Sequence, residues 1–528
     1  MEKHETWLEL KPQSIPIGLN PLRSHFICKV KVIGSESEIP KGNSWIIKRT
    51  ADGKIPRFKV RLVVDGYKQE KGLNYNETFS PVVRPEVLRL ILALAIEDPD
   101  ATVEQIDIVT AFLYGKVQEE IYMRTPAGAS LKPRVVKLLK SLYGLKQAPR
   151  QWHSVIDQFL IHDCSFTKVN STPCLYVKGQ NSTKKLIVSL YVDDITMVGN
   201  SGMIAEFKAK LKQRFDISDF GEIKTCIGIQ IDRDKSQGIT FLHQAQFLED
   251  LLKKTKMDAA NTVPTPALQG MRLTKQMSPH DTDDFRAIKG LEERLPYRAT
   301  VSSLLWLLHT RPEIAFAVGE LSRYVTNPGP NHYAALKRLL RYLKGTRDYG
   351  ILYKTSGSFP VLKLEAYSDS DWAQDLDTRR STTGFLIRLN GNIISTKSKQ
   401  QSSTALSSCE AETVAMGSAA QELVALRSIL LGWDSQLKGH PISSATDNGA
   451  ISFAKDGGQY SKMKHINLRE HFLRDLVKSN EIVPKHINTA CNPADVFTKA
   501  LGPVKFRQHR DFLNIVSRSS IPTLEGGN

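Results

Sequence analysis

The sequence has few cysteines, no long apolar run and no signal peptide, and each lack excludes a class of protein. Its 6 cysteines are scattered over 528 residues without a Cys-x-x-Cys pair, so the sequence predicts neither a disulfide framework nor a zinc site. No apolar run reaches the roughly 20 residues that a bilayer span needs. The opening residues, Met-Glu-Lys-His-Glu, do not form a signal peptide. These features favour a reducing compartment inside the cell.

Acidic residues are outnumbered by basic ones, which leaves a formal net charge of +17. Such an excess favours a polyanionic partner, either nucleic acid or an anionic membrane surface. The basic residues are spread along the chain and no polybasic anchor or lipidation motif is visible, so nucleic acid is favoured and no membrane partner is expected. The length predicts roughly two to four domains.

The first part of the chain contains strand and helix signals of unequal clarity. Residues 1–43 show no clear pattern and are expected to be irregular. Two β-like runs, 45–47 and 58–64, flank a turn and predict a hairpin with basic residues on one arm. Residues 87–96 are apolar nearly all round, which predicts a buried helix. The polar stretch 263–296 lacks periodicity and predicts a linker or long loop.

The later part of the chain begins with an amphipathic helix, 336–344, that has one basic face. That face is interpreted either as a solvated surface or as a helix that follows phosphates, and the two remain open. Asn390-Gly391 between two apolar runs predicts a hairpin. A helix over 408–431 begins with a capping box, and residues 517–528 are expected to be a frayed tail.

Two adjacent acids, Asp193 and Asp194, stand at the tip of an apolar hairpin formed by residues 186–190 and 195–198. Neighbouring carboxylates on apolar strands repel each other and lose hydration, a cost that falls when they share divalent cations. An ordinary Asp-Asp turn is the alternative. Asp107 lies on a separate strand, on the face opposite to its apolar neighbours. These three acids, the first carboxylate set, favour a site for two Mg²⁺ or Mn²⁺ ions, as nucleotide polymerisation requires.

Four acids of the C-terminal third are distributed as in a two-metal nuclease of the ribonuclease H type. Asp369 ends a strand, Glu412 lies in the capped helix, Asp447 follows a strand and Asp495 lies near the end of the chain. Each alone is an ordinary surface acid. Together they form the second carboxylate set and predict a second pair of metal ions that clamp a scissile phosphate and a water. Asp371 competes with Asp369 and ranks second because its strand position is later.

Several motifs, in their order and spacing, resemble one known family. The first group resembles the reverse transcriptase of copia-type LTR retrotransposons: 61–63, 77–82, 105–115, 143–152 (Tyr-Gly-Leu-Lys-Gln-Ala-Pro-Arg-Gln-Trp) and 191–194 (Tyr-Val-Asp-Asp). The second group resembles the ribonuclease H of the same family: 367–373, 380–384, 407–412, 446–448, 464–466 and 492–499. Similarity also covers 220–224, 228–231, 310–318 and 341–346, and extends from about residue 45 to residue 501.

The resemblance implies a multidomain α+β and α/β fold, with a right-hand polymerase followed by a ribonuclease H-like mixed sheet with helices. The expected parts are a poorly matched segment (1–43), fingers and palm (44–265), a linker with thumb and connection helices (266–360), the ribonuclease H domain (361–505) and a tail (506–528). Departures at Cys226-Ile227, at Ser302 and before Trp45 concern thumb packing and the N-terminal fingers rather than the acids.

For the polymerase, the resemblance implies that Asp107, Asp193 and Asp194 bind the catalytic metals. It places Phe112 against the sugar of the incoming nucleotide, where a ring would exclude a 2′-hydroxyl, although a core phenylalanine is the alternative. The remaining candidates are Gly144 and Lys146, in a loop that lines the nucleotide and template site, and Lys59 and Arg61, which hold the triphosphate or are surface charges.

For the ribonuclease H, the resemblance implies that Asp369, Glu412 and Asp447 are metal ligands and that Asp495 is the fourth. His486 stands where this fold has a mobile histidine that assists product release, and a surface histidine is the alternative. Neither an Asp-Ser/Thr-Gly protease motif nor a His/Cys zinc cluster is present, so the chain is expected to be the last part of a polyprotein or a gene fragment of one.

The resemblance implies an enzyme that copies RNA, and then DNA, into DNA and degrades the RNA of the hybrid. Its expected partners are an RNA template, a DNA primer, the RNA–DNA hybrid and dNTPs; an oligomer or association with other Pol and Gag products is left open. The expected location is intracellular, in a cytoplasmic particle or the nucleus. One alternative is a catalytically inactive or domesticated nucleic-acid-binding relic. A group II intron type maturase is disfavoured by the C-terminal motifs.

Overall fold

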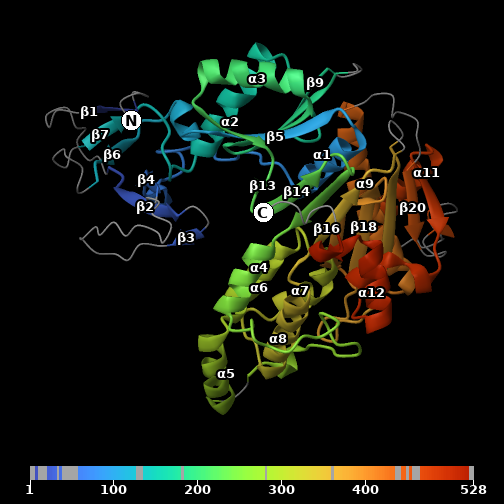
Figure 1. Cartoon of the computed structure of the whole chain (residues 1–528). Coiled ribbons are helices and arrows are strands. Elements are labelled where there is room, and N and C mark those ends of the chain that lie inside the picture. The colour runs from blue at the N-terminus through green and yellow to red at the C-terminus, as the bar shows by residue number, and fades with distance from the viewer. Residues whose placement is uncertain are drawn as a thin grey trace.

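The chain has a mixed α and β fold, which confirms that part of the expected fold class (Figure 1). This computed structural model describes residues 6–9, 21–32, 35–37, 57–126, 135–179, 184–279, 282–357, 362–433, 442–446, 451–452, 454 and 464–521. Within these residues the strands form five sheets. The domain boundaries given above remain predictions.

Two small sheets form the N-terminal lobe, at the left of Figure 1. They are β1 (Trp7–Glu9), β7 (Val135–Leu138) and β6 (Tyr122–Arg124), and β3 (Ser35–Ser37), β2 (Ser24–Val32) and β4 (Arg57–Val64), each in that order. β2 pairs antiparallel with β4 from Ser24 opposite Val64 to Lys31 opposite Arg57. The expectation that residues 1–43 are irregular is therefore wrong for these strands. The expected partner of β4, residues 45–47, lies outside the described residues.

A six-stranded sheet forms the centre of the molecule. In order it contains β12 (Ile217–Glu222), β5 (Ala101–Ile108), β11 (Asp194–Asn200), β10 (Leu186–Tyr191), β9 (Leu175–Lys178) and β8 (Thr167–Lys168). The helices beside it are α1 (Pro85–Glu97), α2 (Ala148–Gln158) and α3 (Ser201–Arg214), with the short η4 (Ala111–Tyr114) and η5 (Phe159–Asp163). In β5, Ile106 and Ile108 are buried whereas Asp107 is partly exposed, as alternation along a strand requires.

The predicted buried helix is α1, which joins two parts of the molecule. Every residue from Val87 to Glu97 is buried, which confirms the prediction. The helix contacts β5 and also β19 (Asn392–Gln400) of the C-terminal sheet. The buried Arg89 donates to the carbonyls of His309 (2.5 Å) and Ile394 (3.4 Å). Because a buried guanidinium needs such acceptors, these bonds fix the helix against both parts.

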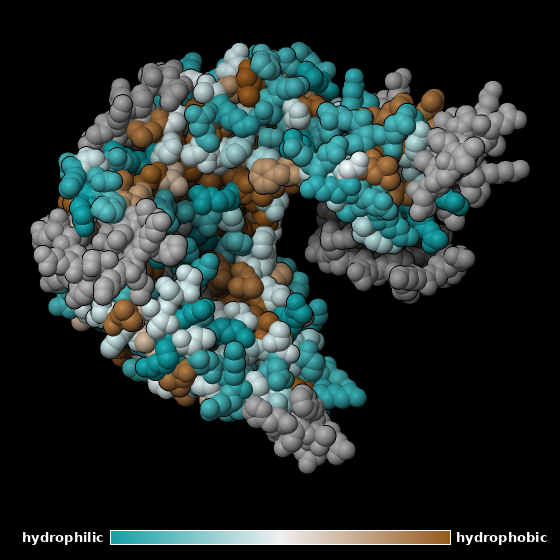
Figure 2. Space-filling model, turned by 180° about the vertical axis from the view of Figure 1, so that it is seen from behind, coloured by the Kyte–Doolittle hydropathy of each residue, from teal (hydrophilic) through white to brown (hydrophobic). Residues whose placement is uncertain are grey.

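A fourth sheet and a group of helices form the helical lobe; in Figure 1 the sheet lies near the centre and the helices extend from it to the bottom. The sheet contains β13 (Thr225–Cys226), β14 (Ile229–Asp234), β15 (Ile239–His243), β16 (Tyr349–Lys354) and β22 (Ile515–Ser517), in that order. The helices are α4 (Ala245–Lys254), η6 (Lys275–Met277), α5 (Thr282–Arg294), α6 (Tyr297–Leu307), η7 (Pro312–Ile314), α7 (Ala315–Ser322) and α8 (Pro330–Gly345). From behind, the surface is deeply hollowed between this lobe and the N-terminal lobe (Figure 2).

Two sequence expectations are wrong in this lobe. The supposed linker 263–296 contains the helix α5. The supposed frayed tail begins with Ser517, which pairs with Tyr349 as part of β22, and continues as η11 (Arg518–Ser520) to the buried Ile521. Both elements are stabilised by contacts with residues far away in the chain, which a local polar pattern does not reveal.

The basic face of α8 has structural partners. Arg338 donates to Thr265 Oγ1 (2.9 Å), Arg341 to the carbonyl of Asn261 (2.6 Å) and Lys344 to the carbonyl of Ala260 (2.7 Å). Three basic side chains thus hold the segment 260–265 against the helix. This role is neither of the two interpretations that the sequence left open.

The C-terminal sheet has the order β19-β18-β17-β20-β21, with β18 (Thr382–Leu389), β17 (Leu364–Ser370), β20 (Ile442–Thr446) and β21 (Ile482–His486). Its helices are α9 (Ser408–Trp433), α11 (Lys464–Lys478), η9 (Thr489–Cys491), η10 (Pro493–Phe497) and α12 (Pro503–Phe512). β17, β20 and β21 are parallel, and β18 and β19 form an antiparallel hairpin. Its turn is Asn390-Gly391, with φ of 48° and 84°, which confirms the prediction.

The helix α9 begins with the predicted cap, since the amide of Glu410 donates to Ser407 Oγ at 3.2 Å. Of the helices among the described residues, α9 alone is long and apolar enough to cross a membrane by length and composition. Most of its apolar side chains are buried, and the helix packs on β17 and β18. A core helix passes the same test, and α9 is packed as one.

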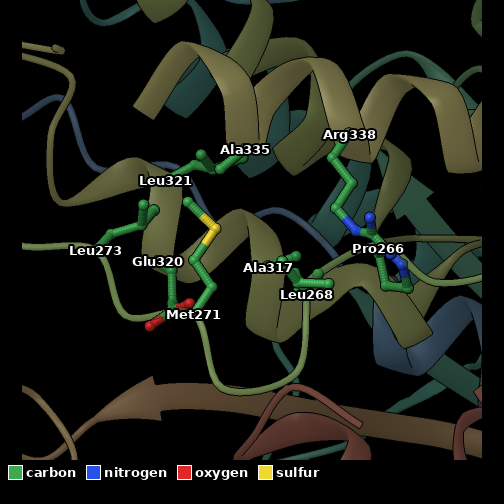
Figure 3. A pocket seen from close by; sticks show the side chains of 10 residues that line it. Pro266, Leu268, Met271, Leu273, Ala317, Glu320, Leu321, Ala335 and Arg338 are labelled. Carbon is green, nitrogen blue, oxygen red and sulfur yellow. The ribbon is translucent and has the colours of Figure 1, made fainter. Parts of the chain in front are cut away.

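A small pocket lies between α7, α8 and residues 266–273, and Glu320 of α7 is among its lining residues (Figure 3). Burial raises the pKa of Glu320 to about 7, with the charges of Arg323 and Arg272 opposing and those of Asp371 and Asp375 adding to the rise. The folded protein therefore binds a proton at Glu320 that the unfolded chain releases at lower pH.

We expect Glu320→Gln to stabilise the protein at pH 8 by about 2 kcal/mol, because the charged carboxylate is unfavourable there. The raised pKa means that wild-type stability falls as the pH rises from about 4.5 through 7, and the glutamine variant lacks this loss. The check is urea unfolding of both proteins at pH 5 and pH 8. The difference should be small at pH 5; a difference that is equal at both values would contradict the prediction.

Candidate active sites

The first carboxylate set is built on one tight hairpin and the strand beside it. β10 and β11 pair up to Tyr191 opposite Asp194, so Val192 and Asp193 form a two-residue turn. Asp194 stands directly opposite Asp107 of β5, and the carbonyl of Asp193 accepts from the amide of Ile108 at 3.0 Å. Opposite residues of an antiparallel pair project to the same face. The structure thus brings Asp107, Asp193 and Asp194 to one end of the sheet.

The turn itself is held in an unfavourable conformation. Val192 has a φ of 59°, which is costly for a β-branched residue. The indole Nε1 of the buried Trp152 donates to the Val192 carbonyl at 2.6 Å, and this side chain comes from α2. Strain that is fixed from outside in this way is typical of functional turns.

The three acids of the first carboxylate set carry charge of the same sign, so they do not neutralise one another. Burial raises the pKa of Asp194, the charge of Asp193 adds to the rise, and a hydrogen bond with Gln105 opposes it. A bound cation would lower this pKa, because it favours the charged carboxylate. Three carboxylates fit a hard divalent ion by donor chemistry. Among the described residues, however, no group of three or more His, Cys, Asp or Glu side chains is gathered closely enough to hold an ion.

Aromatic and basic side chains lie beside the first set. The rings of Phe112 and Tyr143 are 4.7 Å apart and edge to face, and the guanidinium of Arg61 lies 5.5 Å from the Tyr143 ring centre. Burial raises the pKa of Tyr143; the charges of Asp193 and, less, Asp107 add to the rise, and Arg61 opposes it. Phe112 is partly buried and packs against two hydrophobic core clusters, so its role at the sugar and the alternative of a core residue both remain open.

The other candidates of the first site differ in what the structure shows. Gly144 has a φ of 98°, and a Cβ there would lie 2.0 Å from the Val64 carbonyl, so only glycine fits. Lys146 donates to the carbonyl of Gln69 at 3.0 Å and lies 4.7 Å from the Tyr75 ring centre. Both residues therefore fix the loop in place. For Lys59 only the backbone is described; it pairs with Lys29.

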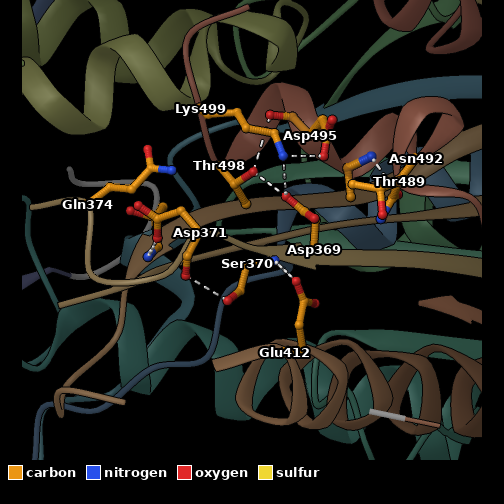
Figure 4. Close-up of polar contacts among 12 residues, drawn as sticks. Asp369, Ser370, Asp371, Gln374, Glu412, Thr489, Asn492, Asp495, Thr498 and Lys499 are labelled. Atoms are coloured by element: carbon orange, nitrogen blue, oxygen red, sulfur yellow. Dashed lines mark hydrogen bonds and ion pairs between the residues drawn. The ribbon is translucent and has the colours of Figure 1, made fainter. Parts of the chain in front are cut away.

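The second carboxylate set is assembled from a strand, a helix and a short helical turn (Figure 4). Asp369 lies on β17, Glu412 on α9 and Asp495 in η10. The Glu412 carboxylate accepts from the amide of Ser370 at 3.1 Å, next to Asp369. Asp447 lies outside the described residues. Three of the four predicted acids are thus placed, on elements that meet at one end of the sheet.

Lys499 connects two of these acids. Its Nζ is 2.8 Å from Asp495 Oδ1 and 3.6 Å from Asp369 Oδ2, and Thr498 Oγ1 donates to the same Asp369 oxygen. Burial raises the pKa of Asp369 to about 7, against the charge of Lys499. Burial lowers the pKa of Lys499, but Asp369 and Asp495 outweigh it and the net direction is upward. The ammonium is therefore a charged partner of both acids.

The structure distinguishes Asp369, on β17, from its competitor Asp371, in the loop that follows this strand. The Asp369 side chain points toward Lys499 and Asp495, whereas Asp371 points away from them (Figure 4). Asp371 accepts from the amide of Thr382 instead, and burial raises its pKa to about 6. This geometry favours Asp369 as the member of the set. The exposed His486 ends β21, opposite Thr446 of β20.

Sequence reasoning missed residues that contact or support the two sets, among them Trp152, Tyr143, Thr498 and Lys499. All four stand inside the motifs quoted above, but their roles depend on neighbours far away in the chain. For Lys499 a local signal existed, since it follows Asp495 by four residues, the spacing of a helical ion pair.

Comparison with known proteins gives one domain match and several long relatives. The family model described as reverse transcriptase (RNA-dependent DNA polymerase) matches residues 31–269. The retrovirus-related Pol polyprotein from transposon TNT 1-94 of Nicotiana tabacum is 38% identical over 492 residues, 91% of this chain and 36% of that protein. The corresponding polyprotein from transposon RE2 of Arabidopsis thaliana is 36% identical over 492 residues, 92% of this chain and 32% of that protein. The chain thus spans about a third of the length of these relatives.

Among solved structures, the foamy viral protease-reverse transcriptase in complex with double-stranded DNA matches 82% of this chain and 63% of its own, at 11% identity and a TM-score of 0.43. This likeness is too low to support conclusions about either set of acids. The sequence relatives confirm the resemblance seen in the motifs. The chain contains a reverse transcriptase domain, and over about nine tenths of its length it is similar to the retrovirus-related Pol polyproteins of plant copia-type retrotransposons.

Proposed function

We propose that the chain is an RNA-directed and DNA-directed DNA polymerase with a fused ribonuclease H that degrades RNA in RNA–DNA hybrids. The observation that carries the polymerase is the register that sets Asp194 opposite Asp107, with Asp193 in the adjoining turn. In this proposal the N-terminal lobe is the fingers, the central sheet the palm and the helical lobe the thumb and connection. The proposed location is a cytoplasmic particle or the nucleus.

At the first site the protein contributes a fixed set of negative charges. Two Mg²⁺ ions, or Mn²⁺ in their place, would be held by the first carboxylate set and would activate the primer 3′-oxygen and stabilise the leaving pyrophosphate. Paired strands hold Asp107 and Asp194, and Trp152 holds the turn that carries Asp193. Such support restricts the backbone that carries the three acids, so that only their side chains would have to move together to bind the ions.

The aromatic group beside the first site is proposed to select and hold the nucleotide. Phe112 packs edge-on against Tyr143, so its ring cannot easily turn away from a sugar placed against it. A fixed ring would exclude a 2′-hydroxyl and favour dNTPs. Arg61 beside Tyr143 is proposed to contact the triphosphate, because a guanidinium binds phosphate oxygens in a fixed fork geometry. Lys59 is proposed for the same task, and Gly144 and Lys146 shape the loop.

At the second site Asp369, Glu412, Asp447 and Asp495 are the proposed ligands of two further ions, which would clamp the scissile phosphate and activate water. The donor chemistry fits, and Lys499 shows that one cationic group reaches both Asp369 and Asp495. His486, exposed at the end of β21, is proposed to assist product release. The net charge of +17 supports binding to a template, a primer and their hybrid through phosphate contacts.

The direct test uses the purified chain with a labelled DNA primer on an RNA template, dNTPs and Mg²⁺. We expect extended products, and a hybrid with labelled RNA should yield shorter RNA. The rival function, an inactive nucleic-acid-binding relic, gives salt-dependent binding of the same duplexes without extension or cleavage. That outcome would replace the proposed function with the rival.

We expect Trp152→Phe to slow primer extension about tenfold while the free energy of unfolding falls by about 2 kcal/mol, from one lost hydrogen bond and the small cavity left by the smaller ring. The phenyl ring keeps the packing on Tyr114 and Phe215 but cannot donate to the Val192 carbonyl. The strained turn is then free to relax and Asp193 loses its position. Single-turnover extension and urea unfolding check the two quantities.

Trp433→Phe is the matched control, because this tryptophan is also buried and its ring lies beside Lys185, at the end of β10 away from the turn. It should leave extension unchanged. Extension by Trp152→Phe at the wild-type rate would show that the indole bond does not position the turn.

A further inference from the structure

The ammonium of Lys499 lies between two acids of the second carboxylate set. Figure 4 shows its Nζ directed at both Asp369 and Asp495. Lys505 of α12 contacts the other Asp495 oxygen, Oδ2. The Asp495 side chain is completely buried and that of Asp369 is 7% exposed, so little solvent separates these charges.

Asp369 and Asp495 both lie within 3.6 Å of the same nitrogen atom, Lys499 Nζ. Two buried carboxylates so close to one atom repel each other unless a positive charge lies nearby. In the structure that charge is supplied by Lys499, which is tethered four residues after Asp495. Thr498 completes the arrangement by donating to the Asp369 oxygen that faces the ammonium. A divalent cation shared by the same two acids would need the same oxygens and would be repelled by the ammonium at close range.

We propose that Lys499 is a positioning residue that holds Asp369 and Asp495 together and competes with the divalent cation for them, so that it sets the cation concentration the second site requires. This inference rests on the proposed ribonuclease H function and deepens it. The side chain of Lys499 is 28% exposed and long, which gives it a path toward solvent when the ion binds.

Competition and a purely structural role predict opposite changes in cation affinity when the charge of Lys499 is removed. If Lys499 only stabilised the site, its removal would loosen the acids and weaken cation binding. If it competes, removal of its charge leaves two buried acids without their partner, so cation binding tightens and the cation-free protein becomes less stable.

The test measures Mn²⁺ binding by electron paramagnetic resonance of the free ion, with the full chain. All proteins carry Asp193→Asn and Asp194→Asn, so that the first carboxylate set does not contribute. We expect Lys499→Met to bind Mn²⁺ at least about tenfold more tightly than the parent. Its melting temperature without cation should be lower than the parent's, and Mn²⁺ should raise it more.

Two further variants separate charge from contact. Lys499→Arg keeps the positive charge and should bind Mn²⁺ as weakly as the parent. Lys505→Met removes a charge that contacts Asp495 but has no ion pair with Asp369, so it should tighten binding less than Lys499→Met. Equal or weaker Mn²⁺ binding by Lys499→Met, or equal tightening by Lys499→Arg, overturns the inference.

Asp369→Asn in the same background distinguishes failure of this inference from failure of the proposed function. If it abolishes the Mn²⁺ site while Lys499→Met leaves the affinity unchanged, the metal site stands and only the role of Lys499 is lost. If Asp369→Asn binds Mn²⁺ as the parent does, the second set does not hold the ion and the proposed ribonuclease H mechanism is lost as well.

Discussion

Replacing Asp193 and Asp194 together with asparagine is expected to reduce primer extension by about 1,000-fold or more without loss of the fold. Loss of a residue that only supports a metal ligand typically costs about 10- to 100-fold, and here two ligands change at once. Asparagine keeps the shape of each side chain but removes the charge that would hold the metal ions. The measurement is extension of a DNA primer on an RNA template with Mg²⁺.

The stability of this variant gives an independent check, because its expected direction is upward. Burial and the neighbouring Asp193 charge both raise the pKa of Asp194, so the charged pair is unfavourable in the folded state near neutral pH. The double variant should therefore melt at the same temperature as wild type or higher. Asp258→Asn, at an exposed position, is the control and should change neither quantity. Wild-type extension by the double variant would remove the polymerase assignment.

Local patterns predicted the elements whose stability is local. The apolar helix α1, the Asn390-Gly391 turn and the cap at Ser407 each have a signal within a few residues, and the structure contains all three. The pairings that the sequence did not reveal are between distant segments. β2 pairs with β4, and β22 pairs with β16, which lies more than 100 residues earlier. Hydrogen bonding between such strands depends on tertiary packing rather than on local propensity.

The acids of the two sites were predictable, whereas their supporting residues were not. An aspartate at a strand end or hairpin tip is conspicuous, because charge there is costly. Trp152 looks like an ordinary core residue until its indole is seen 2.6 Å from the Val192 carbonyl. Asp369 and Asp371 are two residues apart, so along an extended strand both would point to the same face of the sheet and the sequence pattern cannot tell which one belongs to the site. The contacts with Lys499 and Thr382 separate them, and both come from other segments.

Because these contacts distinguish Asp369 from Asp371, Asp369 is the residue to replace at the second site. We expect Asp369→Asn to reduce cleavage of the RNA strand in a hybrid by about 1,000-fold or more, on the same grounds as for the first set. Primer extension should remain at the wild-type level, because Asp369 and the first carboxylate set lie on different sheets. An asparagine oxygen can still accept from Thr498, so the local fold should persist. Cleavage and extension are measured on the same preparation.

Asp371→Asn is the matched control, since it lies two residues away and is equally buried, at 5% exposure for both residues. It should retain cleavage, because its carboxylate accepts from the amide of Thr382 and points away from Lys499 and Asp495. The reverse pattern, with cleavage lost in Asp371→Asn and kept in Asp369→Asn, would transfer the ligand role to Asp371. Loss of extension together with cleavage in Asp369→Asn would mean that the two sites are not independent, and α1, buried between the central sheet and β19, would be the element through which they are coupled.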